Sequence, residues 1–296
     1  MKTGRMVAAA AAFLLTTVTL AAYGQKQVRE TLEPAVRPAS APSTIGGMIE
    51  RMHKVKASVV ALDWTTSSFI IPVAGNTPGS GGTYFRSDVV FRNDRSTSQR
   101  IAVGWLAQGQ NNCSQPVQYF TLTANSITAI DDFVNHQINK SGLGGLLVLA
   151  VTATGDADDD GEIDGYSRIW TPQPGSSGSV SQNFTAIDVN DSLGSLPATL
   201  MGLKQNSQFR TNVGIVNLDT SAGHTWTFTS DFTGAVTSLF VQPCSVGQIG
   251  AVAGSGSALG NASFTVKSDG FGFYWSGFGS SSDNVTGDGW VSRAIQ

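Results

Sequence analysis

Apolar and polar residues alternate in two stretches of the chain that share one order of residue types. Residues 85–93 read FRSDVVFRN and residues 209–217 read FRTNVGIVN, with Phe, Arg, Val and Asn recurring in the same places. Alternating side chains point to opposite faces of a β-strand, so the pattern predicts a strand with one buried face. Arg86, Asp88 and Arg92 are expected on the outer face. The recurrence predicts that one structural unit is used twice.

Other alternating runs, separated by Gly, Asn, Pro and Ser, predict further short strands around this pair. In chain order they cover residues 69–73, 100–106, 117–122, 143–152 and 166–171, and then 184–189, 224–228, 237–241, 262–266 and 270–278. Short turns predict hairpins, with 85–93 joined to 100–106 and 143–152 joined to 166–171. Residues 127–138 are the best helix candidate, because two acidic residues, Asp131 and Asp132, would stabilise its start.

The composition is typical of a chain built mainly of strands. Of 296 residues, 41% are hydrophobic and 13% are charged, which is enough apolar material for the cores of two domains. The 34 glycines favour many turns between short strands. The predicted fold is therefore all-β, with two tandem immunoglobulin-like antiparallel β-sandwiches over residues 57–178 and 179–296.

Residues 1–24 have the pattern of a secretory signal peptide. Lys2 and Arg5 precede an apolar run over residues 6–22, and small residues follow it. A retained membrane anchor is the alternative, but the run is shorter than the ~20 residues that usually span a bilayer. No later stretch is long enough to cross a membrane. The mature protein is expected to be secreted, periplasmic or on the cell surface, with no membrane span.

Residues 25–56 are predicted to form a flexible spacer before the first sandwich. Pro34, Pro38 and Pro42 lie there among small and charged residues with little to bury. Apolar residues over 45–55 have helix-like spacing, so a short amphipathic turn is the alternative for that part.

Two cysteines, Cys113 and Cys244, fall in different predicted units. In an exported protein they favour a single disulfide, which over roughly 130 residues would contribute up to ~5 kcal/mol on the chain-entropy model. Two separate buried thiols are the alternative. Because the two positions are not equivalent in the two units, a bridge would join the units across their interface.

The charge balance argues against a nucleic-acid partner. The formal net charge is −3 at pH 7, and loss of Lys2 and Arg5 with the leader would make the chain more acidic. Binding to nucleic acid needs clustered Lys and Arg that neutralise phosphates. The sequence lacks such clusters, so no nucleic acid is expected as a partner.

An acidic segment, residues 155–165, is inserted between two predicted strands of the first unit and has no counterpart in the second. Its alternating aspartates and central glycine resemble the calcium loops of EF-hand, dockerin and thrombospondin-type repeats. The implied ligands are the side chains of Asp156, Asp158, Asp160 and Asp164 and the carbonyl of Glu162. Ser167 stands at the twelfth place instead of a bidentate Glu, so the resemblance implies weak, stabilising calcium binding. A solvated acidic turn is the alternative.

Aromatic residues gather over 271–278 and allow two interpretations. Exposed, they would form a platform for sugar rings, but alternation explains Phe271, Phe273 and Trp275 equally well as a buried strand face. The three histidines are far apart in the sequence, and no Gly-x-Ser-x-Gly motif accompanies a suitably placed His and acid. No catalytic residue is predicted.

Several segments together resemble a group of uncharacterised exported bacterial β-sandwich proteins. They are the FIIPV run at 69–73, the glycine-rich loop at 75–82, the two Phe-Arg strands, the pair Ser167 and Arg168, and the SDNVTGD run at 282–288. The resemblance implies the fold and an exported location, and it carries no activity. The expected function is a non-catalytic structural or binding module of the cell exterior, whose partner is an unknown protein or polysaccharide. Carbohydrate binding through exposed aromatics is the alternative, and a secreted hydrolase is a distant third.

Overall fold

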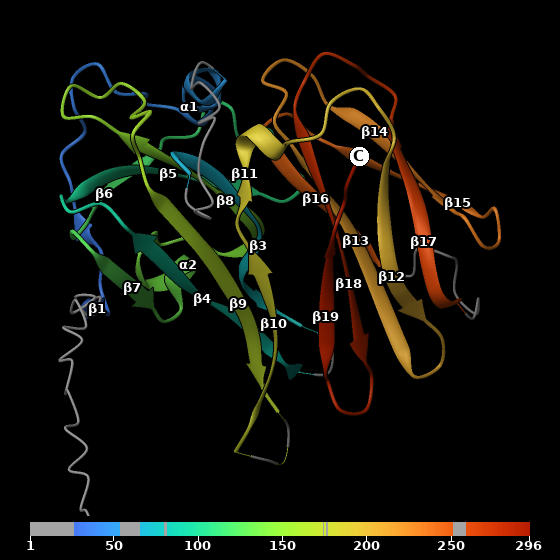
Figure 1. Ribbon diagram of the computed structural model, residues 1–296. Coiled ribbons are helices and arrows are strands. Elements are labelled where there is room, and N and C mark those ends of the chain that lie inside the picture. Colours follow the sequence, from blue (N-terminus) through green and yellow to red (C-terminus); the bar gives the residue numbers. More distant parts are fainter. Residues whose placement is uncertain (1–26, 54–65, 80–81, 174, 176, 251–258) are drawn as a thin grey trace, which may run out of the picture.

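The computed structural model describes residues 27–53, 66–79, 82–173, 175, 177–250 and 259–296. The predicted signal peptide, residues 1–24, lies outside the described residues. Figure 1 shows two layered β-structures side by side, one formed by the blue-to-green part of the chain and the other by the orange-to-red part. The described chain is all-β, as predicted, and its sheets are mainly antiparallel.

The first half contains two short helices and most of one β-sandwich. Its elements are β1 (Gln27–Arg29), β2 (Glu33–Pro34), α1 (Ile45–Met52), β3 (Ser68–Pro78), β4 (Tyr84–Asn93), β5 (Gln99–Ala107), β6 (Gln118–Leu122), β7 (Ser126–Ile130), α2 (Phe133–His136), β8 (Gly142–Val151) and β9 (Ile163–Pro172). The elements that follow are β10 (Ser179–Thr185), β11 (Ile187–Asp188), a 3-10 turn (Val189–Asp191), β12 (Ala198–Gln205), β13 (Phe209–Asn217), β14 (His224–Ser230), β15 (Val236–Val241), β16 (Ser245–Gly250), β17 (Leu259–Ser268), β18 (Trp275–Asp283) and β19 (Gly289–Arg293).

The first sandwich has one layer in the order β11-β3-β8-β5-β6-β2 and a second in the order β1-β7-β4-β9-β10. The two layers are connected at one end, where β3 pairs with β4 through Thr77 and Phe85. Phe69, Phe91, Ile101 and Leu146 are among the buried residues that fill the space between the layers. Alternate residues of the predicted strands thus meet in one core, as the pattern requires.

The second sandwich has layers in the orders β12-β17-β14-β15 and β16-β13-β18-β19. Trp226, Phe228, Phe264 and Trp275 are buried between them. Within the described chain, the eight strands β3 to β10 and the eight strands β12 to β19 are arranged in the same order. In each set, the first, sixth, third and fourth strands make one layer, and the fifth, second, seventh and eighth make the other. The two Phe-Arg strands, β4 and β13, therefore lie at equivalent positions.

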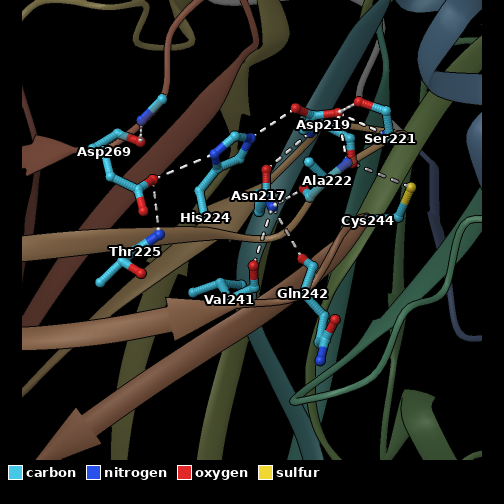
Figure 2. Close-up of polar contacts among 12 residues, drawn as sticks. Asn217, Asp219, Ser221, Ala222, His224, Thr225, Val241, Gln242, Cys244 and Asp269 are labelled. Carbon is cyan, nitrogen blue, oxygen red and sulfur yellow. Dashed lines mark hydrogen bonds and ion pairs between the residues drawn. The ribbon is translucent and has the colours of Figure 1, made fainter.

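Both Phe-Arg strands end in the same buried turn around their final asparagine. The Asn93 side-chain amide donates to the carbonyls of three residues, Thr97, Leu122 and Thr123. The Asn217 amide donates to those of Ala222, Val241 and Gln242 (Figure 2). Each asparagine also accepts from the backbone N–H two residues later. The turn that receives the amide contains a left-handed residue in both halves, Asn125 with φ 47° and Cys244 with φ 49°.

The predicted hairpins of 85–93 with 100–106 and of 143–152 with 166–171 are wrong. β4 pairs with β7 and β9, whereas β5 pairs with β6 and β8, so the chain crosses from one layer to the other between them. β8 and β9 are likewise in different layers, as are β17 and β18. Each strand of such a crossing buries one face in the shared core, as it would in a hairpin, so the sequence pattern does not separate the two arrangements.

The predicted helix over 127–138 is also largely wrong. Residues 126–130 form β7, and only Phe133–His136 is helical. Ile127, Thr128 and Ile130 are β-branched, a side-chain type that favours strands, and they alternate between the core and the outer face. Asp132 caps this single turn with a left-handed backbone, φ 48°.

The predicted flexible spacer is wrong for most of the residues described there. β1 pairs with β7, β2 pairs with β6, and α1 packs on the first sandwich. Met48, Ile49 and Met52 are buried, and the Thr44 hydroxyl caps the helix by accepting from the Gly47 N–H. The alternative for residues 45–55, a short amphipathic turn, is therefore confirmed as α1. Its apolar side covers the outside of β5 and β8. No helix in the described part of the chain is long and apolar enough to cross a membrane.

The two sandwiches share an apolar interface and one covalent bond. Val216, Val246 and Phe278 of the second half belong to the same buried cluster as α1 and the outer faces of β3 and β8. The predicted disulfide between Cys113 and Cys244 is confirmed, with a Cα–Cα distance of 5.2 Å. Beside it, the buried side chain of Asn112 donates to the Cys244 carbonyl at 3.0 Å. This contact fixes a loop of the first sandwich against the second.

Residues 184–189, predicted to open the second unit, belong to the first sandwich. β10 pairs along its whole length with β9, and β11 pairs with β3. The strand at the opening position of the second sandwich is instead β12, which pairs with β17. The prediction missed β12 because Pro197, Gly202 and a register irregularity near Leu203 interrupt its alternation.

Candidate functional site

Polar and aromatic side chains stand opposite each other on the outer face of β4 and β9. In the register of this strand pair, Arg86 lies across from Trp170, and Asp88 lies across from Arg168. The alternation that buries Val89 and Phe91 places Arg86 and Asp88 on the opposite face of β4. The sequence therefore predicted the side of the strand correctly, although it did not predict the partners on β9.

A cleft with a volume of about 700 Å³ lies on this face. We call it the Arg86–Trp170 cleft. Its lining residues are Asn76, Tyr84, Arg86, Asp88, Asp131, Asp132, Asn135, His136, Arg168 and Trp170. The sheet provides the floor, and the turn that leads into α2 provides one wall. The volume is within the range that small-molecule sites usually occupy.

Two ion pairs and one further carboxylate, that of Asp131, supply the charges of the cleft. Asp88 accepts a hydrogen bond from the Trp170 indole at 2.9 Å and one from Arg168 at 3.2 Å. The Asp132 carboxylate accepts from the Asn135 amide at 3.1 Å and lies 3.7 Å from the Arg86 guanidinium. Paired charges of this kind give a dense set of donors and acceptors with little net charge. The cleft thus suits a polar ligand that is itself uncharged.

The aromatic rings of the cleft are held by the two arginines. The Arg86 guanidinium lies 5.4 Å from the ring centroid of Tyr84 and 5.7 Å from that of Trp170. Arg168 lies 5.6 Å from the Trp170 ring. These contacts are in the range of cation–π attraction and fix the orientation of the indole. Tyr84 remains 38% exposed, so the rim of the cleft presents an aromatic surface to solvent.

In this structure the side chains of the predicted calcium ligands do not point toward a common centre. Asp156 pairs with Arg51 at 3.2 Å, and Asp158 pairs with Arg95 at 2.7 Å. Burial raises the pKa of Asp164, against the lowering effects of the Gly165 N–H and of Arg92. Across the described residues, no group of three or more His, Cys, Asp or Glu side chains lies together in a way that could hold a metal ion. As they lie, these residues do not fit a calcium ion.

Calcium binding by Asp156, Asp158, Asp160, Glu162 and Asp164 stays a prediction, and it now requires that two ion pairs open. Any binding should have a dissociation constant of ~0.1 to 1 mM, which gives about 0.4 to 1.4 kcal/mol at ~1 mM calcium. Calorimetric melting with calcium and with chelator measures it, with Asp158→Ala plus Asp160→Ala as the variant. A melting temperature that does not change with calcium would mean that the loop only anchors α1 and the turn between β4 and β5 through ion pairs.

Only part of the aromatic segment 271–278 is exposed, namely Phe271 and Tyr274. Trp275 is 1% exposed, and its indole donates to the Gly194 carbonyl at 2.8 Å. Phe273 stacks on His224 with ring centroids 3.9 Å apart. Phe271 is exposed, but it precedes β18, which begins at Trp275. The interpretation as a buried strand face therefore holds for Trp275 and fails for Phe271.

His224 lies between two carboxylates rather than on an open strand, as Figure 2 shows. Its Nε2 is 2.7 Å from Asp219 and its Nδ1 is 3.4 Å from Asp269. Burial alone would raise the pKa of Asp219, but hydrogen bonds from His224, from the Ser221 hydroxyl and from two backbone N–H groups lower it to about 2. Asp219 also accepts a backbone hydrogen bond from Cys244 through its carbonyl, at 3.1 Å. The cluster stabilises the turn beside the disulfide.

This cluster predicts a loss of stability in acid. The folded pKa of Asp219 is below its ordinary value of 3.8, so its contribution is present above that value and is lost as the pH falls toward about 2. Asp219→Asn should lower stability at pH 7 by about 1 kcal/mol after solvent screening, and by much less near pH 2. Thermal melts of both proteins between these values test this. An effect that does not change with pH would contradict it. Asp269→Asn, at the more exposed acid of the same cluster, should cost less stability than Asp219→Asn.

Sequence reasoning missed Trp170, Tyr84 and the turn before α2 as parts of one site. The available signal was the outward position of Arg86 and Asp88 together with the pair Ser167 and Arg168. Alternation puts Arg168 and Trp170 on one face of their strand, but only the pairing of β4 with β9 places that face beside Arg86. Compared with known proteins, the chain matches no family model, no curated protein and no solved structure.

Proposed function

We propose that this protein is an exported, non-catalytic binding module whose ligand is a neutral saccharide held in the Arg86–Trp170 cleft. The observation that carries the proposal is the combination of rings and paired charges on one exposed sheet face. Sugar rings stack their C–H faces on aromatic side chains, and their hydroxyls need many donors and acceptors. Tyr84 and Trp170 offer the rings, and the ion-paired residues offer the donors and acceptors.

We also propose that the two sandwiches are tandem immunoglobulin-like copies of one unit. The equal order of strands and the equal turns at Asn93 and Asn217 support this. Export is supported by the predicted leader and by the disulfide, because such bonds persist in oxidising compartments. A module of this kind acts outside the cytoplasm, where polysaccharides are accessible partners.

The location of the ligand differs from the alternative considered from the sequence. Saccharide binding was expected at residues 271–278, but Trp275 is buried there and Phe273 is covered by His224. The cleft on β4 and β9 has a ring on its rim and a volume of about 700 Å³. It is therefore the better place for the same class of ligand.

Trp170→Ala should weaken saccharide binding by about 5- to 12-fold, because one ring contact contributes ~1 to 1.5 kcal/mol. The experiment first screens the purified mature protein on an array of neutral α- and β-linked oligosaccharides. Calorimetry then compares wild type, Trp170→Ala and Arg86→Ala on the best ligand, and chromatography checks for cleavage products.

The matched control is Arg210→Ala, since Arg210 lies across from Ser282 on β13 and β18 as Arg86 lies across from Trp170. It should leave the affinity unchanged. The proposal is rejected if no oligosaccharide binds, or if Trp170→Ala binds as tightly as wild type while its melting temperature is unchanged. Release of shorter sugars would show that the protein is a hydrolase and not a non-catalytic binding module.

A further inference from the structure

A second cleft, with a volume of about 600 Å³, lies between the two sandwiches. We call it the inter-sandwich cleft. One wall comes from β3, β8, β9 and β10 of the first sandwich, and the other comes from β13, β16 and β18 of the second. Interfaces between domains are common places for ligand sites. The disulfide and the apolar interface hold the two walls in a fixed relation.

The wall from the first sandwich combines a group of apolar side chains with several threonines and glutamines. Its residues include Val73, Leu143, Ile169, Val180 and Phe184. Val73 and Phe184 are almost fully buried, whereas Leu143, Ile169 and Val180 are partly exposed to the cleft. An aliphatic chain of a ligand would remove this exposed apolar surface from water, which favours binding.

The wall from the second sandwich is polar and carries one positive charge. Asn212, Gln248, Ser280 and Ser282 contribute amides and hydroxyls. Arg210 lies among them on the same face of β13, where its guanidinium donates to the neutral side chain of Asn284 at 3.0 Å. Within the described part of the chain, no carboxylate lies within ion-pair distance of Arg210.

Asp283 is the acidic residue among those that line the inter-sandwich cleft. Its carboxylate is already engaged, because it accepts from the N–H groups of Val285 and Thr286 and from the Gln208 amide. These hydrogen bonds lower the pKa of Asp283. Asp283 therefore stays ionised, and its negative charge is held in its own turn, where it forms no ion pair with Arg210.

The equivalent face of the first sandwich carries an acidic residue where the second sandwich has an amide. Arg86 and Arg210 are both second in their Phe-Arg strands, and the residues two places later are Asp88 and Asn212. In the first sandwich, Asp88 supplies a negative charge beside the arginines. In the second, an amide takes its place, so the same face keeps the cation and lacks the acid.

We propose that the inter-sandwich cleft binds amphipathic monocarboxylates, with the aliphatic chain against the apolar side chains of the first sandwich and the carboxylate on Arg210. An arginine without an acidic partner binds a carboxylate through two parallel hydrogen bonds. The apolar side chains of the first sandwich supply a surface for a chain of methylene groups. This site is separate from the Arg86–Trp170 cleft and takes a different class of ligand.

The test uses octanoate, 1-octanol and octylamine as probes of the mature, disulfide-bonded protein by calorimetry. Octanoate should bind more tightly than octylamine. Arg210→Gln should weaken octanoate about 10-fold and leave 1-octanol unchanged, while Val180→Asn should weaken both. Arg86→Gln, the same change on the first sandwich, should have no effect.

The proposal is overturned if octanoate does not bind, if octylamine binds as tightly, or if Arg210→Gln leaves octanoate unaffected. Arg210→Gln and Val180→Asn change residues that are exposed at least in part. Melting temperatures equal to that of the wild type would show that both variants fold. Trp170→Ala should bind octanoate normally, so failure of this site is distinguishable from failure of the saccharide site.

Discussion

Removal of the Cys113–Cys244 disulfide is expected to lower the free energy of unfolding by about 4 kcal/mol. The bond closes a loop with a sequence separation of 131 residues, and the entropy that such a loop removes from the unfolded chain grows with its length. Cys113 also holds α1, since its carbonyl accepts from the Gly46 N–H at 2.9 Å. Loss of the bond should therefore loosen both the interface between the sandwiches and the N-terminal helix.

The best variant for this measurement is Cys113→Ala with Cys244→Asn. Cys244 has φ 49°, and its counterpart in the first sandwich is Asn125 with φ 47°, so asparagine keeps the left-handed backbone. Cys113→Ala with Cys244→Ala should lose about 1 kcal/mol more, because alanine adopts this conformation poorly. Guanidinium unfolding of the wild type and of the two double variants, with and without reductant, gives both differences in the free energy of unfolding. Equal midpoints for the oxidised wild type and the asparagine variant would contradict the prediction.

Asn217→Ala is expected to cost about 3 kcal/mol or more, and Asn93→Ala should cost a similar amount. Each side chain is fully buried and donates to three backbone carbonyls. Alanine leaves those acceptors without donors in a site that water does not reach, at about 1–3 kcal/mol for each unsatisfied group. The measurement is chemical unfolding of both variants.

A second pair of substitutions separates hydrogen bonding from volume. Asn217→Asp and Asn93→Asp keep the size of the side chain but cannot donate at neutral pH, so they should destabilise at least as much as alanine. The control is Asn212→Ala, on the outer face of the same strand as Asn217, which should change stability by less than about 0.5 kcal/mol. If the two asparagines differ widely in cost, the two turns are not energetically equivalent.

Sequence reasoning located several strands, such as β4, β5 and β8, because it read the pattern that a buried core imposes, but it missed β7 and β12. The stretch 85–93 predicts one buried face, and Val89 and Phe91 are buried as expected. The sequence also favoured the disulfide over two separate thiols, because two cysteines behind a predicted leader suggest one bridge. The acidic segment 155–165 illustrates the limit, because its spacing places carboxylates in order but does not show that Arg51 and Arg95 form ion pairs with two of them.

By itself, the sequence determined the class of fold, the buried faces of the Phe-Arg strands and the recurrence of their pattern. Only the tertiary structure decided which strands pair, that 179–188 belong to the first sandwich, and that residues 30–53 pack against it. The physical reason is that alternation reports whether a side chain is buried and carries no information on which layer buries it. For the same reason the Arg86–Trp170 cleft, built from two strands and a turn far apart in the chain, appeared only once β4 and β9 were paired.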